Sequence, residues 1–219
     1  MSRYSLAVFD VDGTLLDTGD GILASIEYTM DHFGLEKPDR EKLMGFIGPP
    51  IQDSFAKTYG LEGDILQEIA TVFRDRYSTA DLLKAVPYPG ITELFAELSL
   101  NGIQPAIATY KRQDYALTLL KHFGFDRYTS IMYGGDHENK LKKCDIIQKC
   151  IDAAGITDLS EVIMIGDTLN DAAGAEKLGI DFAAVTYGFG FKTARELDSI
   201  KKVFTAHSSS DLSAFFKEN

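Results

Sequence analysis

Short apolar runs alternate with longer amphipathic segments along most of the chain. Runs that are apolar at every position, such as Val162–Ile165, are typical of strands buried on both faces of a parallel sheet. The apolar runs predict six strands, Leu6–Asp10, Gln104–Thr109, Ile131–Tyr133, Val162–Gly166, Phe182–Thr186 and Lys202–Thr205. The amphipathic segments predict five helices between or after them, Ile91–Asn101, Gln113–Phe123, Lys143–Ala154, Asn170–Leu178 and Ala194–Ile200. This alternation predicts an α/β fold with a parallel sheet.

One stretch after the first strand interrupts this alternation. It contains no convincing strand, and its patterns predict helices over Asp20–Phe33, Ile51–Tyr59 and Asp64–Ser78. Pro87-Tyr88-Pro89-Gly90 then marks the return to the α/β pattern. We therefore predict a small helical domain, residues 18–84, inserted into a sheet domain made of residues 1–17 and 85–219. A last helix is predicted over Leu212–Lys217, after a capping loop at 207–211.

Composition and charge exclude several classes of partner. The chain has 219 residues, with 22 basic and 33 acidic side chains and a net charge of −11. A protein with this negative charge is a poor binder of nucleic acid polymers or anionic membranes. To bind an anionic substrate, it requires local positive charge or a metal ion. No apolar segment has the length of a signal peptide or a membrane span. The two cysteines, Cys144 and Cys150, point apart on a helix and fit a reducing, cytoplasmic location.

The strongest chemical signal is Phe9-Asp10-Val11-Asp12-Gly13-Thr14, where two carboxylates follow an apolar strand two positions apart. If the strand geometry continues, both side chains lie on one side of the chain. Ligands of parallel α/β sheets bind at the carboxyl ends of strands, which is where this motif falls. Gly13 allows a sharp turn that exposes backbone N–H groups. Two such acids can serve as a nucleophile and a general acid/base.

A second group of carboxylates follows the strand Val162–Gly166. In Gly166-Asp167-Thr168-Leu169-Asn170-Asp171, a helix that begins near Thr168 places Asp167 and Asp171 about one turn apart. Carboxylates at a strand end suit Mg²⁺, which prefers hard oxygen ligands. Helix capping by aspartate is the alternative reading of this motif.

Two further motifs supply groups that can bind phosphate. Thr109 ends the strand Gln104–Thr109, where a hydroxyl and backbone N–H groups can hold phosphate oxygens. Lys140-Leu141-Lys142-Lys143 leads into the first turn of a predicted helix, an end that normally favours negative charge. A lysine at that place is therefore expected to neutralise an anionic group.

These four motifs, in this order, resemble those of the haloacid dehalogenase-like superfamily, and in particular its phosphatase branch. The family signatures are DxDGT-L-x-D, a threonine at a strand end, a lysine before a helix and GDxxxD. The resemblance extends over essentially the whole chain and implies a Rossmann-like parallel sheet with a small helical cap domain. Gly45–Pro50 followed by Asp53-Ser54-Phe55 resembles the phosphoglycolate phosphatase/5′-nucleotidase-like subgroup.

The resemblance implies a mechanism with assigned residues. Asp10 attacks phosphorus and forms an aspartyl-phosphate, while Asp12 protonates the leaving oxygen and then activates water. The implied Mg²⁺ ligands are Asp10, the backbone carbonyl of Asp12, Asp167 and, directly or through water, Asp171. Thr109 binds phosphoryl oxygens and Lys143 neutralises charge, with Lys140 as the second candidate for that lysine. Asp12 favours phosphatase over dehalogenase chemistry, because dehalogenases of this fold lack an acid there.

The substrate-binding residues expected from the resemblance are Gly13, Thr109, Tyr110, Gly48 and Pro49. Tyr110 departs from the small or polar residue of many relatives, and its ring either shapes the pocket or packs inside the protein. The expected activity is Mg²⁺-dependent hydrolysis of a small phosphomonoester such as phosphoglycolate, a nucleoside monophosphate or a sugar phosphate. The alternatives are a phosphomutase of the β-phosphoglucomutase type and a non-catalytic binding protein. The Gly48-Pro49-Pro50 loop lacks the adjacent basic residue that such mutases use.

Overall fold

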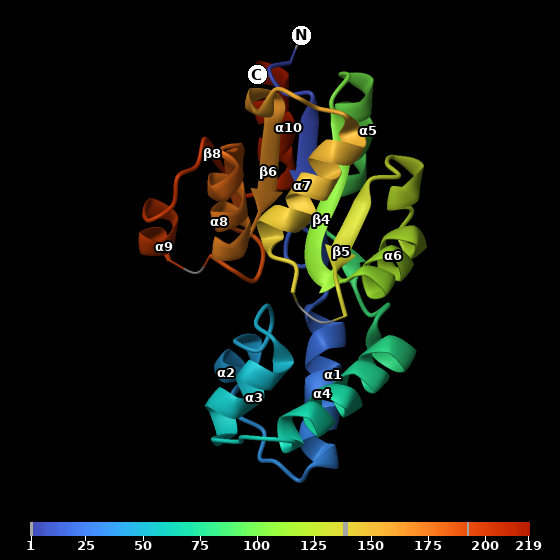
Figure 1. Ribbon diagram of the computed structural model, residues 1–219, viewed down its shortest axis with the longest axis vertical. Coiled ribbons are helices and arrows are strands. Elements are labelled where there is room, and N and C mark those ends of the chain that lie inside the picture. The colour runs from blue at the N-terminus through green and yellow to red at the C-terminus, as the bar shows by residue number, and fades with distance from the viewer. Residues whose placement is uncertain (1, 138–139, 192) are drawn as a thin grey trace. The chain divides into compact units, whose positions relative to one another are not determined.

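The structure is a computed structural model that describes residues 2–137, 140–191 and 193–219. The chain divides into two compact units. The α/β unit consists of the segment up to Asp17 together with Pro87–Asn219, and the helical unit is Thr18–Val86 (Figure 1). The chain therefore passes between the units twice, next to two short strands that pair with each other, β2 (Leu16–Asp17) and β3 (Val86–Pro87).

The α/β unit is built on a six-stranded parallel sheet with the order β5-β4-β1-β6-β7-β8. Its strands are β1 (Leu6–Phe9), β4 (Gln104–Arg112), β5 (Met132–Gly135), β6 (Val162–Gly166), β7 (Asp181–Val185) and β8 (Phe204–Ala206). β1 lies between β4 and β6, with Phe9 opposite both Ile107 and Ile165. The three strands that carry the chemical motifs are thus neighbours, and their carboxyl ends meet at one edge of the sheet. The predicted α/β class with a Rossmann-like parallel sheet is confirmed.

Helices cover both faces of this sheet (Figure 1). They are α5 (Ile91–Leu100), α6 (Gln113–His122), α7 (Lys143–Ala154), α8 (Leu169–Leu178), α9 (Ala194–Asp198) and α10 (Ser209–Glu218), with short 3₁₀ turns η2 (Phe125–Arg127) and η3 (Leu159–Glu161). Along β1, Leu6 and Val8 pack in one core with Ile147 of α7 and Ala172 of α8. Phe9 meets Phe95 of α5 with a ring-centroid distance of 4.9 Å. Strands buried on both faces explain the continuously apolar sequence runs.

The helical unit contains four α-helices, namely α1 (Gly19–His32), α2 (Arg40–Met44), α3 (Ile51–Tyr59) and α4 (Ile65–Arg76), and the π-helical turn η1 (Tyr77–Asp81). Its core includes Ile26, Met30, Phe55 and Ile69, which are fully buried. Phe46 and Phe55 pack edge to face at 5.4 Å between ring centroids, and they are core residues of this unit.

A buried carboxylate anchors the end of the helical unit. Asp81 is fully buried, and its carboxylate accepts bonds from Ser25 Oγ at 3.0 Å and Arg76 Nε at 2.7 Å. Lys84 Nζ lies 2.7 Å from its other oxygen. Burial by itself raises the pKa of Asp81. The hydrogen bonds from Lys84, Arg76 and Ser25 outweigh the effect of burial and hold the pKa below its ordinary value. The ionised form therefore stabilises the folded state.

We expect Asp81→Asn to lower the free energy of unfolding of the helical unit by about 2–4 kcal/mol, because it breaks charge-assisted bonds in a buried site. Urea denaturation at pH 7 measures this, with Asp75→Asn on the exposed face of α4 as the control, expected to change stability by less than about 0.5 kcal/mol. Because the folded-state pKa of Asp81 is depressed, its contribution is present above about pH 4 and is lost as the pH falls further. A difference between wild type and Asp81→Asn that stays constant from pH 7 to pH 3 would contradict this account.

Several boundaries differ from those expected from sequence. β4 continues to Arg112 instead of ending at Thr109, because its last residues pair with β5. α10 begins at Ser209, three residues before the predicted start, because Ser208 caps it by accepting a bond from Asp211 N. The short elements α2, β2 and β3 were not predicted, since each is too short to show a hydrophobic period.

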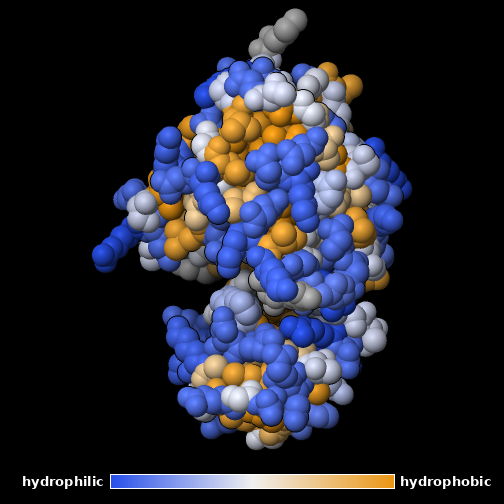
Figure 2. All heavy atoms as spheres, viewed as in Figure 1, coloured by the Kyte–Doolittle hydropathy of each residue, from blue (hydrophilic) through white to orange (hydrophobic). Residues whose placement is uncertain are grey.

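The surface is mostly hydrophilic, as the high content of charged residues predicts. In the view of Figure 2, hydrophilic side chains cover most of the visible surface, and hydrophobic ones form separate patches. In the described part of the chain, no helix combines the length and apolar composition needed to cross a membrane. Cys144 and Cys150 are both free and buried, as expected from their spacing.

Candidate active site

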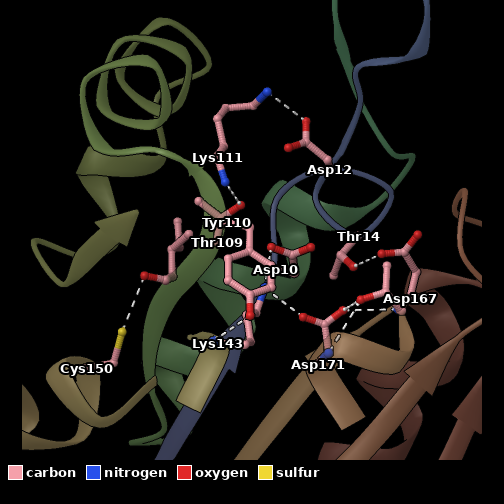
Figure 3. Close-up of polar contacts among 12 residues, drawn as sticks. Asp10, Asp12, Thr14, Thr109, Tyr110, Lys111, Lys143, Cys150, Asp167 and Asp171 are labelled. Carbon is pink, nitrogen blue, oxygen red and sulfur yellow. Dashed lines mark hydrogen bonds and ion pairs between the residues drawn. The ribbon is translucent and has the colours of Figure 1, made fainter. Parts of the chain in front are cut away.

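A cluster of buried polar side chains lies where β1, β4 and β6 end (Figure 3). Asp10 directly follows β1, Asp167 directly follows β6, and Thr109 lies in the last part of β4. Parallel strands bring their carboxyl ends to the same edge of a sheet, so three segments far apart in sequence meet here. Lys143 and Asp171, near the starts of α7 and α8, complete the cluster.

A buried lysine links two of the carboxylates. Lys143 Nζ lies 2.7 Å from Asp10 Oδ1 and 2.6 Å from Asp171 Oδ1. Burial lowers the pKa of Lys143, but the charges of Asp10 and Asp171 more than offset it and raise the pKa above its ordinary value. The lysine is therefore a fixed cation beside the Asp10 carboxylate.

Asp171 is held in place by a helix cap. Its Oδ2 accepts bonds from Thr168 N at 3.0 Å and Thr168 Oγ1 at 2.6 Å, which forms a capping box at the start of α8. Asp171 Oδ1 makes no hydrogen bond of good geometry to the described residues, although Lys143 Nζ is close to it. The capping interpretation of this motif is therefore confirmed, and the second oxygen of Asp171 lies close to Lys143 in the cluster, while its role in a metal site stays a prediction.

Asp167 is fixed by a glycine-rich loop after β7. Its Oδ2 accepts bonds from Phe189 N at 2.8 Å and Gly190 N at 2.9 Å, and its Oδ1 accepts one from Thr14 Oγ1 at 3.3 Å. Gly13 lies close by with φ of +82°, and a Cβ at this position would collide with the Asp167 carboxylate. Gly13 is therefore required for close packing of the β1 loop against Asp167.

Three carboxylates in this cluster could hold a metal ion. Asp10, Asp167 and Asp171 are all buried, and each offers an oxygen within 4.8 Å of the others. Burial raises the pKa of Asp10 to about 6, an effect that Lys143 opposes and the charges of Asp171 and Asp12 reinforce. Burial, together with the charges of Asp171 and Asp10, raises the pKa of Asp167 to about 7. A divalent cation would relieve this repulsion, and an all-oxygen set of ligands fits Mg²⁺.

The Asp12 side chain lies outside this cluster. Its Oδ1 forms an ion pair with Lys111 Nζ at 3.0 Å, and it is more exposed than the clustered carboxylates (Figure 3). The strand ends at Phe9, and the chain then turns, with Thr14, Leu15 and Leu16 donating to Val11 O. Asp12 therefore lies in a turn beyond the strand, but its charge is still close enough to contribute to the raised pKa of Asp10.

Thr109 and Tyr110 face the site from β4. Thr109 is buried, and its Oγ1 accepts a bond from Lys111 N at 3.1 Å, which leaves the hydroxyl hydrogen able to donate. The Tyr110 hydroxyl accepts a bond from Lys143 N at 2.9 Å, while the residue is 40% exposed. Tyr110 thus connects β4 to the start of α7 and still presents its ring at the surface of the α/β unit.

Three other predicted residues are exposed. Lys140 is exposed, and its backbone N donates to Asp136 Oδ1, whereas Lys143 is buried among the carboxylates. Gly48 and Pro49 are exposed in the loop between α2 and α3 of the helical unit, with φ of +108° at Gly48. Their assignment as substrate-binding residues stays a prediction.

Sequence reasoning missed several supporting residues. Thr14 and the Phe189-Gly190 amides bond Asp167, Tyr187 donates to Thr14 O at 3.1 Å, and Lys111 pairs with Asp12. The Gly188-Phe189-Gly190 sequence was the available signal, because closely spaced glycines allow a backbone to approach another group. A Cβ at Gly188 or Gly190 would collide with the backbone of Gly13 or Asp167.

The parallel sheet thus carries a buried Asp10–Lys143–Asp171 arrangement where its central strands end. Residues 7–185 match the family model described as haloacid dehalogenase-like hydrolase, and the chain belongs to this family. The resemblance predicted from the motifs is therefore confirmed, and the chain is an enzyme of the phosphatase type.

Individual relatives match nearly the whole chain. It is 32% identical over 213 residues to a 5′-nucleotidase of Pseudomonas aeruginosa, an alignment that covers 97% of this chain and 94% of the relative. It is 31% identical to the pyrophosphatase PpaX of Halalkalibacterium halodurans, with 90% of each chain covered. A solved haloacid dehalogenase-like hydrolase from Streptococcus pneumoniae superimposes with a TM-score of 0.89 at 30% identity, covering 99% of this chain and 100% of that one.

Proposed function

We propose that this protein is a Mg²⁺-dependent phosphatase that hydrolyses small phosphomonoesters through an aspartyl-phosphate on Asp10. The observation that carries the proposal is the position of Asp10, buried at the end of β1, 2.7 Å from the Lys143 ammonium and within a cluster of three carboxylates. Phosphoryl transfer depends mainly on positioning and charge stabilisation, and these residues supply both.

The first step uses two residues of the β1 loop. An oxygen of Asp10 attacks phosphorus and forms a new P–O bond, while the bond between phosphorus and the leaving oxygen breaks. Asp12 gives its proton to that leaving oxygen. In the second step Asp12 takes a proton from water, the water oxygen attacks phosphorus, and the bond to Asp10 breaks to release inorganic phosphate.

Other residues of the chain bind and neutralise the phosphoryl group. The Thr109 hydroxyl and the backbone N–H groups around Gly13 donate to its oxygens, and Lys143 compensates charge next to Asp10. Asp10, the Asp12 carbonyl and Asp167 are the proposed Mg²⁺ ligands, with Asp171 orienting the site through its cap to Thr168. Bound there, Mg²⁺ supplies positive charge that lets a phosphate dianion approach several carboxylates.

The helical unit is the proposed cap that selects the substrate, with Gly48 and Pro49 among its contacts. The relatives named 5′-nucleotidase and pyrophosphatase make nucleoside 5′-monophosphates and pyrophosphate candidate substrates, beside phosphoglycolate and sugar phosphates. A cytoplasmic location is proposed because two free, buried thiols suit a reducing compartment.

Phosphate release from a panel of these compounds tests the proposal. With Mg²⁺ present, we expect release from at least one of them, and EDTA should lower it by at least about 10²-fold because the carboxylate charges are then uncompensated. Adding Mg²⁺ back should restore it. Release that EDTA does not change would reject the metal, and no release by folded, Mg²⁺-loaded protein would favour a mutase or a binding protein.

A further inference from the structure

A tyrosine on β4 holds the start of the helix that carries Lys143. The Tyr110 hydroxyl accepts a hydrogen bond from Lys143 N at 2.9 Å, and Figure 3 shows this hydroxyl directed at Lys143. Lys143 is the first residue of α7, and the backbone N–H groups of a first helical turn have no acceptor inside the helix. The preceding amide, Lys142 N, donates to Asp145 Oδ2 at 2.8 Å. Two neighbouring amides at this helix start are therefore fixed, one by the helix itself and one by the sheet.

The sheet fixes the position of Tyr110. This residue lies in the stretch of β4 between Ala108 and Arg112, where the pairing with β5 is irregular. A Cβ at Gly135 of β5 would lie 2.7 Å from Tyr110 O, so glycine at this position lets the two backbones approach closely. Because its backbone is packed against β5 in this way, Tyr110 is a fixed acceptor for Lys143 N.

Close contacts also restrict the side chain of Lys143, of which only 3% is exposed. On α8, a Cβ at Gly174 would lie 3.1 Å from Lys143 Cγ, so glycine there leaves room for the aliphatic part of the lysine. Lys143 Nζ lies 5.7 Å from the centroid of the Tyr110 ring, a distance at which an aromatic face attracts a cation. Tyr110 therefore contacts both ends of the lysine, the backbone through its hydroxyl and the ammonium through its ring.

We propose that Tyr110 is a positioning residue that keeps the Lys143 ammonium beside Asp10. A lysine side chain is long and flexible, so its ammonium stays 2.7 Å from Asp10 Oδ1 only while the backbone that carries it is fixed. Misplacement of a catalytic group by about 1 Å can cost on the order of 10²-fold in rate. This role rests on the proposed phosphatase function. It differs from the substrate contact that the resemblance implies for Tyr110, because the tyrosine acts through Lys143.

Tyr110→Phe tests this role, because it removes the hydroxyl and keeps the ring. We expect it to lower kcat by about tenfold, the effect of one lost hydrogen bond in a buried site. KM should change by less than about twofold for compounds with different leaving groups, since no substrate contact is removed. Phosphate release from the panel compounds with Mg²⁺ measures both constants. Tyr133→Phe is the matched control, because the Tyr133 hydroxyl on β5 bonds no other residue that the structure describes, and both constants should stay within about twofold of wild type.

A second comparison separates positioning of the ammonium from support of the helix. Lys143→Met removes the ammonium but keeps the backbone N–H group that donates to Tyr110. In this background, Tyr110→Phe should therefore change the remaining activity by less than about twofold, while its effect on the urea midpoint should be the same in both backgrounds. An equal loss of activity with and without the Lys143 side chain would overturn the proposal. A rise in KM that depends on the leaving group would overturn it as well, since Tyr110 would then contact the substrate.

The ammonium itself gives a measurement that needs no turnover. Its ¹H–¹⁵N NMR signal is identified by its absence from Lys143→Met. We expect Tyr110→Phe to speed exchange of the ammonium protons with water by about tenfold, the same ratio as for kcat, and Tyr133→Phe to leave the exchange unchanged. Unchanged exchange in Tyr110→Phe would overturn the proposal. Faster exchange without phosphate release from any compound would reject the phosphatase function and support the positioning of Lys143 by Tyr110.

Discussion

We expect Asp10→Asn to lower phosphatase activity by at least about 10⁴-fold, because an amide cannot replace the proposed carboxylate nucleophile and removal of a nucleophile is among the largest single effects in an active site. The substitution keeps the shape of the side chain, and Asp10 N still donates to Ile165 O, so β1 remains attached to β6. Phosphate release with a saturating substrate and Mg²⁺ measures the loss. Acid quenching during turnover provides a second readout, since wild type should retain phosphate on the protein and the variant should not.

The stability of this variant distinguishes a chemical role from a structural one. Burial raises the pKa of Asp10 to about 6, so ionised Asp10 destabilises the metal-free fold at pH values above that. In EDTA at pH 8 we therefore expect the melting temperature of Asp10→Asn to be equal to or above that of wild type. A variant that is inactive and also much less stable would show that Asp10 serves the fold, and substantial residual activity would show that another residue is the nucleophile.

Lys143→Met should lower activity by about 10²–10³-fold, comparable to removing one group that stabilises developing charge. The ammonium lies 2.7 Å from Asp10 Oδ1 and 2.6 Å from Asp171 Oδ1, both buried, so its loss brings two like charges together without compensation. Breaking a buried ion pair by removing one partner also costs about 3–5 kcal/mol of stability. Kinetics and urea denaturation of the same preparation measure both effects.

Lys140→Met is the matched control for this experiment, because Lys140 belongs to the same basic run and its side chain is exposed. We expect it to change activity by less than about twofold and stability by less than about 0.5 kcal/mol. Equal losses in the two variants would mean that the basic run acts through its overall charge. A larger loss in Lys140→Met would make Lys140 the catalytic lysine, the second candidate from the sequence.

Much of the fold was predictable because it depends on local patterns. Continuously apolar runs such as Val162–Ile165 mark buried parallel strands, and the amphipathic period marks the helices that cover them. Errors were confined to short elements and to ends, such as β4 beyond Thr109 and α10 before Leu212. The end of β4 depends on its irregular pairing with β5, and the start of α10 depends on the Ser208 cap. Neither feature changes the periodic pattern of hydrophobic residues, so the sequence pattern does not show it.

The sequence by itself determined the class of site, because the chemistry-bearing residues Asp10, Thr109 and Asp167 come at the ends of strands, and parallel strands end at one edge. The tertiary structure alone decided the partners: Asp12 with Lys111, Asp167 with the Phe189-Gly190 amides, and Lys143 between two carboxylates. Those contacts join segments that are distant in sequence through turns, bulges and glycine loops. No periodicity fixes the direction of a side chain in such segments, so only the folded chain shows which charge lies beside which.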